Sequence, residues 1–313
     1  MSSLRVLITC RQMQNCIESF QDRFAARDIA LDLPEVMQQP TEEELIAIIG
    51  DYDGMIAGDD PLNARVLAHA KRMRVISKWG VGVDGIDLEA ATTQGIAVTN
   101  TPDVFGDDVA DVAAGYLVML ARQLHRIDAS VRDGGWLKHE GVALARKTLG
   151  VVGFGSIGQA LARRGHAFGM TVIAHDIALA VRDVALSEGV ELVSREDVFI
   201  RSDFLVLCVP LTPETTQLVN AATLRLMRQG SFLVNVARGG LVDESALAAA
   251  LDSGHLAAVA LDVFEEEPLP PDSPLRAFPH CVFGSHNGSN TIEGVLRASE
   301  RAVENLLAGL ERT

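Results

Sequence analysis

The chain is poor in cysteine, in long apolar runs and in positive charge. Its 313 residues include four cysteines without CxxC spacing, so neither a disulfide framework nor a cysteine-based metal site is indicated. No apolar run approaches the ~20 residues that a membrane-spanning helix needs. With 27 basic against 42 acidic residues, the formal net charge of −15 argues against nucleic acid and anionic membranes as partners.

The N-terminal sequence is typical of a first buried strand rather than a signal peptide. The apolar stretch at residues 4–10 is short, and no small-residue cleavage site follows it. Three of the four cysteines lie in or beside apolar, strand-like segments, where a cysteine is usually a small buried hydrophobic residue. Together these features predict a reduced, cytoplasmic protein.

Short apolar runs alternate with amphipathic stretches, and hydrophobic residues make up 48% of the chain. This alternation is typical of βαβ units with a parallel sheet, and the length indicates two domains. We therefore expect an α/β protein with two Rossmann-like, doubly wound domains. The predicted strands are Leu4–Thr9, Gly54–Ala57, Val75–Ser77, Ile96–Thr99, Leu149–Gly153, Thr171–Ala174, Phe204–Val209, Phe232–Val236, Ala258–Leu261 and Cys281–Phe283. The predicted helices are Glu42–Ile49, Asp107–Arg126, Gly158–Phe168, Glu244–Asp252 and Ile292–Leu310.

The most specific motif is a glycine-rich turn between a strand and a helix, followed by an acid. The sequence reads Gly-Phe-Gly-Ser-Ile-Gly after an apolar strand, and the next predicted strand leads to Asp176. This context predicts a dinucleotide site, with a tight turn, a close backbone approach to a pyrophosphate and close helix–strand packing at the three glycines. The loop residues expected to bind the cofactor are Gly153, Gly155, Ser156, Ile157 and Gly158.

Asp176 favours NAD over NADP. A carboxylate at this position accepts hydrogen bonds from the ribose hydroxyls and repels a 2′-phosphate. Arg182 could soften that preference, although a solvated loop charge is the simpler interpretation.

The position of the glycine motif predicts the domain organisation. Almost 150 residues precede it, enough for a separate α/β domain. Residues 1–101 with 289–313 are expected to form a substrate domain, and residues 102–288 the NAD-binding domain, with Thr101-Pro102 as a breakpoint. The apolar helix predicted at Asp107–Arg126 suits a homodimer interface.

Three further segments place a polar residue after an apolar strand, where ligands gather in doubly wound sheets. They end in Arg238, in the acids Glu265–Glu267 and in His286. Taken singly, each has a plain explanation: a surface ion pair, a solvated charge run and a loop histidine. Their common position after strands that follow the NAD motif indicates a catalytic site.

These motifs resemble the D-isomer-specific 2-hydroxyacid dehydrogenase family, whose members include D-3-phosphoglycerate, glyoxylate and D-lactate dehydrogenases. The matching stretches are Gly80-Val-Gly-Val-Asp-Gly-Ile-Asp87, Val151–Gly158 with Asp176, Asn235-Val-Ala-Arg238-Gly-Gly, Leu261-Asp-Val-Phe-Glu-Glu-Glu267-Pro268 and His286. The resemblance implies an NAD-binding domain inserted in a flavodoxin-like substrate domain. It also implies a homodimer that transfers hydride reversibly between NAD(H) and a small 2-hydroxy or 2-oxo acid, with 3-phosphoglycerate and glyoxylate or hydroxypyruvate as candidates.

The resemblance also implies roles for individual residues. Arg238 would bind the substrate carboxylate, His286 would be the acid–base group, and Glu267 would hydrogen-bond the imidazole and favour its charged form. Asp262 would contact the nicotinamide carboxamide. The remaining implied cofactor contacts are Val209, Pro210, Thr215, Val236, Ala237 and His286 itself, and the implied substrate contacts are Lys78, Val81, Gly82 and Arg238. Thr212 and Thr215 have an alternative role as turn caps.

The loop after the third expected strand departs from the phosphoglycerate pattern. There phosphoglycerate dehydrogenases tend to supply arginines, whereas this chain has Asp59 and Asp60, which repel a phosphate. Lys78 and Lys138 are possible anion contacts. Alternatively, Asp59 caps a helix starting near Pro61.

Other functions remain open on the same scaffold. A nucleotide-sensing, corepressor-like binding protein would share the fold, and a formate dehydrogenase would pair the histidine with glutamine instead of Glu267. No histidines show metal-ligand spacing, so no metal is expected. Trp136 could pack in a dimer interface or cover a neighbour's pocket.

Overall fold

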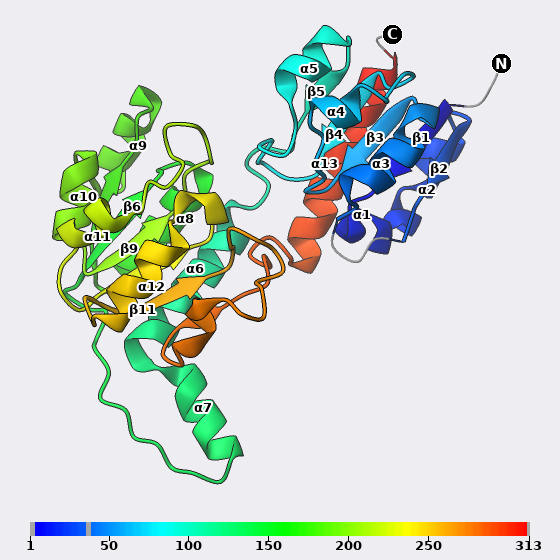
Figure 1. The fold of residues 1–313 in the computed structure, drawn as a ribbon. Helices are drawn as coiled ribbons and strands as arrows, with labels where there is room; N and C mark the ends of the chain where they lie inside the picture. The colour runs from blue at the N-terminus through cyan, green and yellow to red at the C-terminus, as the bar shows by residue number, and fades with distance from the viewer. Residues whose placement is uncertain (1–3, 36–38, 312–313) are drawn as a thin grey trace. The chain divides into compact units, whose positions relative to one another are not determined.

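The computed structural model describes residues 4–35 and 39–311, and the chain divides into two compact units. One comprises Met1–Phe105 with Asn290–Thr313, and the other comprises Gly106–Ser289 (Figure 1). No helix in the described ranges has both the length and the apolar character needed to cross a bilayer.

The first unit is built on a five-stranded parallel sheet with the order β2-β1-β3-β4-β5, which is the flavodoxin-like order. The strand order reverses between β1 and β3, so the carboxyl ends of these strands form the edge where such folds bind ligands. The strands are β1 (Leu4–Ile8), β2 (Ile29–Asp32), β3 (Gly54–Ala57), β4 (Val75–Lys78) and β5 (Ala97–Thr99). The helices are α1 (Arg11–Asn15), α2 (Gln21–Ala25), α3 (Glu42–Ile48), α4 (Ala64–Leu67), α5 (Leu88–Thr93) and α13 (Ile292–Glu311).

The last helix, α13, completes the first unit. Ser77 Oγ on β4 donates to the Ala302 carbonyl at 2.9 Å, and Trp79 Nε1 donates to Ser299 Oγ at 3.0 Å. A Cβ at Gly309 would lie 2.5 Å from a Val75 methyl, so glycine permits this close approach of helix and sheet. The C-terminal helix therefore packs against the sheet of the N-terminal strands.

The second unit is built on a seven-stranded parallel sheet with the order β12-β11-β10-β9-β6-β7-β8. This is the Rossmann order extended by one strand, with the reversal between β6 and β9. The strands are β6 (Thr148–Val152), β7 (Thr171–His175), β8 (Glu191–Leu192), β9 (Phe204–Leu207), β10 (Ser231–Asn235), β11 (Leu256–Leu261) and β12 (Val282–Phe283). The helices are α6 (Gly106–Arg122), α7 (Leu124–Arg132), α8 (Ser156–Ala167), α9 (Arg182–Ser187), α10 (Arg195–Arg201), α11 (Ala221–Leu226) and α12 (Glu244–Asp252).

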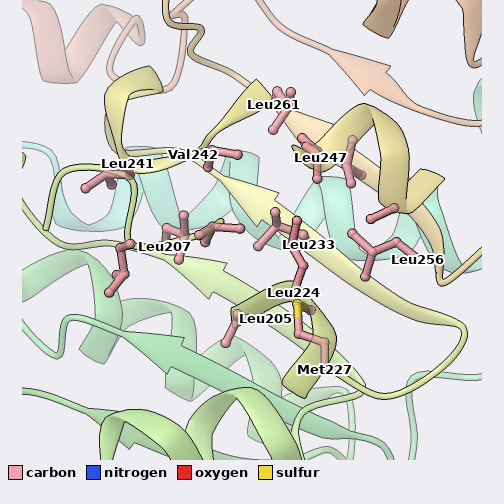
Figure 2. Close-up of a cluster of buried hydrophobic side chains, with 14 of the residues drawn as sticks. Leu205, Leu207, Leu224, Met227, Leu233, Leu241, Val242, Leu247, Leu256 and Leu261 are labelled. Atoms are coloured by element: carbon pink, nitrogen blue, oxygen red, sulfur yellow. The ribbon is translucent and has the colours of Figure 1, made fainter. Parts of the chain in front are cut away.

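Strands β9 and β10 are buried along their whole length, as expected when helices cover both faces of a parallel sheet. Their leucines pack against leucines of α11 and α12, for example Leu205 and Leu233 with Leu224 and Leu247 (Figure 2). This aliphatic core supports the ends of β9, β10 and β11, where the polar loops begin.

The long helix predicted at Asp107–Arg126 is wrong as a single element. Helix α6 ends at Arg122 and α7 begins at Leu124, because Gln123 adopts a left-handed conformation with φ +52°. The Gln123 side chain donates to the carbonyls of Leu120 and His280, which holds the break in place. Helix α7 buries none of its residues.

Candidate active site

The glycine loop after β6 has the geometry of a dinucleotide turn. Gly153 has φ +93°, and a Cβ there would lie 2.5 Å from the Cys208 carbonyl oxygen. A Cβ on Gly158 would lie 2.2 Å from the Gly153 carbonyl oxygen, so α8 packs directly against the strand end. At Gly155, by contrast, nothing lies within 4 Å, and Ser156 and Ile157 open the helix beside it. The loop therefore faces open space at Gly155, at the N-terminus of α8, where helix N–H groups are available to a pyrophosphate.

Asp176 is held beside this loop at the end of β7. Its Oδ2 accepts a hydrogen bond from the Phe154 amide at 2.6 Å, and its Oδ1 accepts from the Ala178 amide at 2.7 Å. The carboxylate is therefore oriented by main-chain donors and keeps lone pairs for further partners. Arg182 is exposed and begins α9.

The loop after β9 is closed by Thr215. Its hydroxyl donates to the Pro210 carbonyl at 2.7 Å and accepts from the Thr212 amide at 2.7 Å. The alternative role of Thr215 as a turn cap is the one that this geometry supports. Val209 and Pro210 lie at the start of the same turn.

Arg238 stands on a loop organised by Asn235, the last residue of β10. The buried Asn235 side chain accepts from the Ala237 amide at 3.1 Å and donates to the Arg238 carbonyl at 2.8 Å, across Val236. The guanidinium donates to the Ala237 carbonyl at 2.8 Å.

Gly239 brings this loop against the next one. A Cβ at Gly239 would lie 1.8 Å from the Phe264 carbonyl oxygen, so only glycine fits between the loops after β10 and β11. The arginine and the acidic loop are thereby neighbours.

His286 and Glu267 form a direct pair. His286 Nδ1 lies 2.8 Å from Glu267 Oε2, and Glu267 Oε1 accepts from the Phe264 amide at 3.0 Å. The two side chains are 27% and 22% exposed, so the pair is shielded yet open to a small molecule. Since Nδ1 faces the carboxylate, proton exchange with a bound molecule falls to Nε2.

Sequence reasoning missed one residue of this neighbourhood, Tyr116 on α6. Its hydroxyl donates to Asp262 Oδ1 at 3.0 Å, and burial together with the Asp262 charge raises the pKa of Tyr116. In the sequence, Tyr116 looks like one more apolar position of a buried helix face. No pattern of its own distinguishes it.

In the first unit, Lys78 is buried at the end of β4 and already paired. Its Nζ donates to Asp59 Oδ1 at 3.0 Å and to the Trp79 carbonyl at 2.9 Å. The prediction that Asp59 caps a helix near Pro61 is wrong: α4 starts at Ala64, and the Asn63 side chain caps it.

Asp60 lies at the reversal point of the first sheet, between the ends of β1 and β3. Its Oδ2 accepts from Thr9 Oγ1 at 2.7 Å, and burial raises the pKa of Asp60 to about 6.

The loop after β4 carries the main-chain groups expected to bind substrate. Thr101 exchanges two hydrogen bonds with Gly80, each 2.9 Å long, and Asn100 Nδ2 donates to the Val81 carbonyl at 2.7 Å. Gly82 follows, and the Val81 side chain is 47% exposed. These hydrogen bonds from Asn100 and Thr101 fix the loop backbone, while Val81 is accessible.

Comparisons with known proteins agree with this description. The model of the D-isomer-specific 2-hydroxyacid dehydrogenase NAD-binding domain matches residues 114–288. D-3-phosphoglycerate dehydrogenase of Methanocaldococcus jannaschii is 41% identical over 87% of this chain. The match spans only about half (52%) of the length of that relative. Glyoxylate reductase of Korarchaeum cryptofilum is 37% identical over 97% of the chain and 92% of its own length.

A solved structure extends the likeness to the whole fold. The crystal structure of D-lactate dehydrogenase from Aquifex aeolicus, complexed with NAD and lactic acid, superimposes with a TM-score of 0.86 at 27% identity. The superposition covers 98% of this chain and 96% of that one. The resemblance expected from the motifs is confirmed, and the chain belongs to the D-isomer-specific 2-hydroxyacid dehydrogenase family.

Proposed function

We propose that this protein is an NAD-dependent dehydrogenase that interconverts a 2-hydroxy acid and a 2-oxo acid. The observation that carries the proposal is the His286–Glu267 pair, whose side chains lie 2.8 Å apart. The loops that carry this pair follow strands of the same sheet as the glycine turn and the Arg238 loop. Because all strands of this sheet are parallel, their carboxyl ends share one edge, and these groups converge there.

Each side chain has a defined task in the proposed reaction. Bound NADH supplies the hydride to C2 of the 2-oxo acid, and NAD accepts it in the reverse direction. Arg238 pairs with the substrate carboxylate through its planar guanidinium. On the first unit, the main chain of Val81 and Gly82 is proposed as a substrate contact. His286 Nε2 donates a proton to the 2-oxo oxygen, or removes it from the hydroxyl, while Glu267 holds Nδ1.

The proposed cofactor contacts all lie in the second unit. Gly153, Gly155 and Gly158 shape the pyrophosphate turn. The Asp176 carboxylate accepts hydrogen bonds from the ribose hydroxyls and repels a 2′-phosphate, which favours NAD. Asp262 and the residues at the ends of β9 and β10 line the nicotinamide side.

The substrate is proposed to lack a phosphate. The ammonium of Lys78 at the end of β4 is neutralised by Asp59 at 3.0 Å, and Asp60 adds a further carboxyl beside it. A phosphate would have to displace Asp59 and approach Asp60. A 2-oxo acid with an uncharged or cationic tail avoids both costs.

The assembly is proposed to be a homodimer. Helix α7 buries none of its residues, and the segment that follows exposes Trp136 to 79%. Leu124 and Val131 of α7 add apolar surface. A second copy of the chain would cover this surface. The four unpaired cysteines fit a reducing compartment, so we place the protein in the cytoplasm.

Replacement of His286 by alanine tests the proposed chemistry. Loss of a general acid–base group is expected to lower kcat by about 10²- to 10⁴-fold while NADH still binds. His166→Ala, at an exposed position of α8, is the matched control and should leave kcat unchanged. A His286→Ala enzyme with the kcat of the control would contradict the assignment.

A further inference from the structure

Asp262 joins both sides of the turn that carries His286. Its main-chain carbonyl accepts from the His286 amide at 2.7 Å, and its carboxylate Oδ2 accepts from the Gly288 amide at 2.8 Å. His286 has φ +55°, a backbone conformation that side-chain-bearing residues rarely adopt. The turn therefore depends on these contacts to keep the imidazole in place.

The carboxylate of Asp262 fits tightly between glycines. Asp262 is 2% exposed, and a Cβ at Gly284 would lie 2.0 Å from Oδ1 and 2.3 Å from the Tyr116 hydroxyl. A Cβ at Gly288 would lie 3.1 Å from Oδ2. The carboxylate has no room to turn as long as its two oxygens keep their partners.

Tyr116 supplies the partner of Oδ1. Its hydroxyl lies 3.0 Å away, on the buried face of α6, and the ring is 9% exposed. Within the described parts of the chain, no other donor to Oδ1 is present in the hydrogen-bond network. A buried carboxylate oxygen without a donor is costly, because nothing replaces the water it has lost.

We propose that Tyr116 is a positioning residue for the reaction: by holding the Asp262 carboxylate, it fixes the turn 286–288 and the orientation of the His286 imidazole. The proposal rests on the proposed function, because it assigns His286 the proton transfer. Tyr116 thereby links the long helix α6 to the acid–base group.

Replacement of Tyr116 by phenylalanine removes only the hydroxyl and keeps the ring. A hydrogen bond to a charged group is worth enough to change an equilibrium by about 10- to 100-fold, so we expect kcat to fall within this range. The KM for the 2-oxo acid should stay within about threefold, because Arg238 stands on the loop after β10, whereas the Tyr116–Asp262 hydrogen bond supports the turn of His286. A general loosening of the fold would move both constants.

The chain contains two tyrosines, which gives a matched control. Tyr52 is also buried and also donates to a carboxylate, that of Asp32 in the first unit. Tyr52→Phe should leave kcat unchanged. A Tyr116→Phe enzyme with the kcat of Tyr52→Phe would overturn the proposal.

A spectroscopic measurement keeps the proposal testable if Tyr116→Phe does not fold. In the Tyr52→Phe chain, 3-fluorotyrosine enters position 116 alone and retains the donor, so kcat should equal that of the unlabelled control. Its ¹⁹F resonance should shift when NADH and oxamate bind. A ¹⁹F chemical shift that changes with neither ligand would overturn the proposal. If the unlabelled enzyme turns over no 2-oxo acid, the proposed function fails. A shift of the resonance with NADH alone would still support a link from Tyr116 to the cofactor site.

Discussion

Replacement of Asp176 by alanine tests the proposed cofactor site without touching the acid–base pair. The carboxylate accepts two short main-chain hydrogen bonds, 2.6 Å from Phe154 and 2.7 Å from Ala178. Alanine removes both, together with the acceptors proposed for the ribose hydroxyls. A hydrogen bond to a charged group contributes about 1.5–3 kcal/mol, and the loss of one at the upper end corresponds to about a 100-fold weaker NADH affinity.

The affinity for NADPH should change differently from the affinity for NADH. The variant loses the hydrogen bonds that order the loop for both cofactors. For NADPH alone, the repulsion between the Asp176 carboxylate and the 2′-phosphate also disappears. We expect the ratio of NADPH to NADH affinity to rise at least about 10-fold, measured by fluorescence titration of both cofactors. Asp183→Ala, which removes an exposed carboxylate on α9, is the control. NADH affinity equal to that of this control, with an unchanged cofactor ratio, would refute the ribose assignment.

Two other substitutions test the substrate site and a buried carboxyl. Arg238→Lys loses the planar fork, so the KM for the 2-oxo acid should rise about 10- to 100-fold while NADH affinity stays constant; an unchanged KM would place the substrate carboxylate elsewhere. Burial raises the pKa of Asp60 from its ordinary 3.8 to about 6, so the free energy of unfolding should fall as the pH rises from about 4 to above 6, by roughly 3 kcal/mol. Asp60→Asn should remove this loss, so that urea unfolding shows a stabilised variant at pH near 8 but not near 4. Equal differences at both pH values would contradict the raised pKa of Asp60.

The features that could be predicted from the sequence are those with local causes. The glycine turn lies within a single strand–turn–helix unit, and a Cβ at Gly153 or Gly158 would meet atoms of that unit or of the neighbouring strand end. Arg238, Glu267 and His286 follow apolar strands, and a parallel sheet places the ends of such strands on one edge. The family motifs then add the roles that residue types alone leave open.

The features that were missed depend on partners distant in sequence. The break at Gln123 is held by the carbonyl of His280, and Asp59 pairs with Lys78 instead of capping a helix. Tyr116 meets Asp262 across 146 positions. Strands β2 and β8 lie at the edges of their sheets, where partial exposure permits polar residues and weakens the apolar pattern.

The central claim is tested most directly by NADH oxidation with a panel of 2-oxo acids. The panel would run from glyoxylate and hydroxypyruvate through phosphohydroxypyruvate to branched, acidic and amino-bearing members. We predict turnover of members with uncharged or cationic tails and poor turnover of the phosphorylated member, since Asp59 neutralises Lys78. Strong turnover of phosphohydroxypyruvate would contradict the proposed substrate class. No turnover of any member, with NADH binding intact, would contradict the dehydrogenase function itself and favour a cofactor-sensing role.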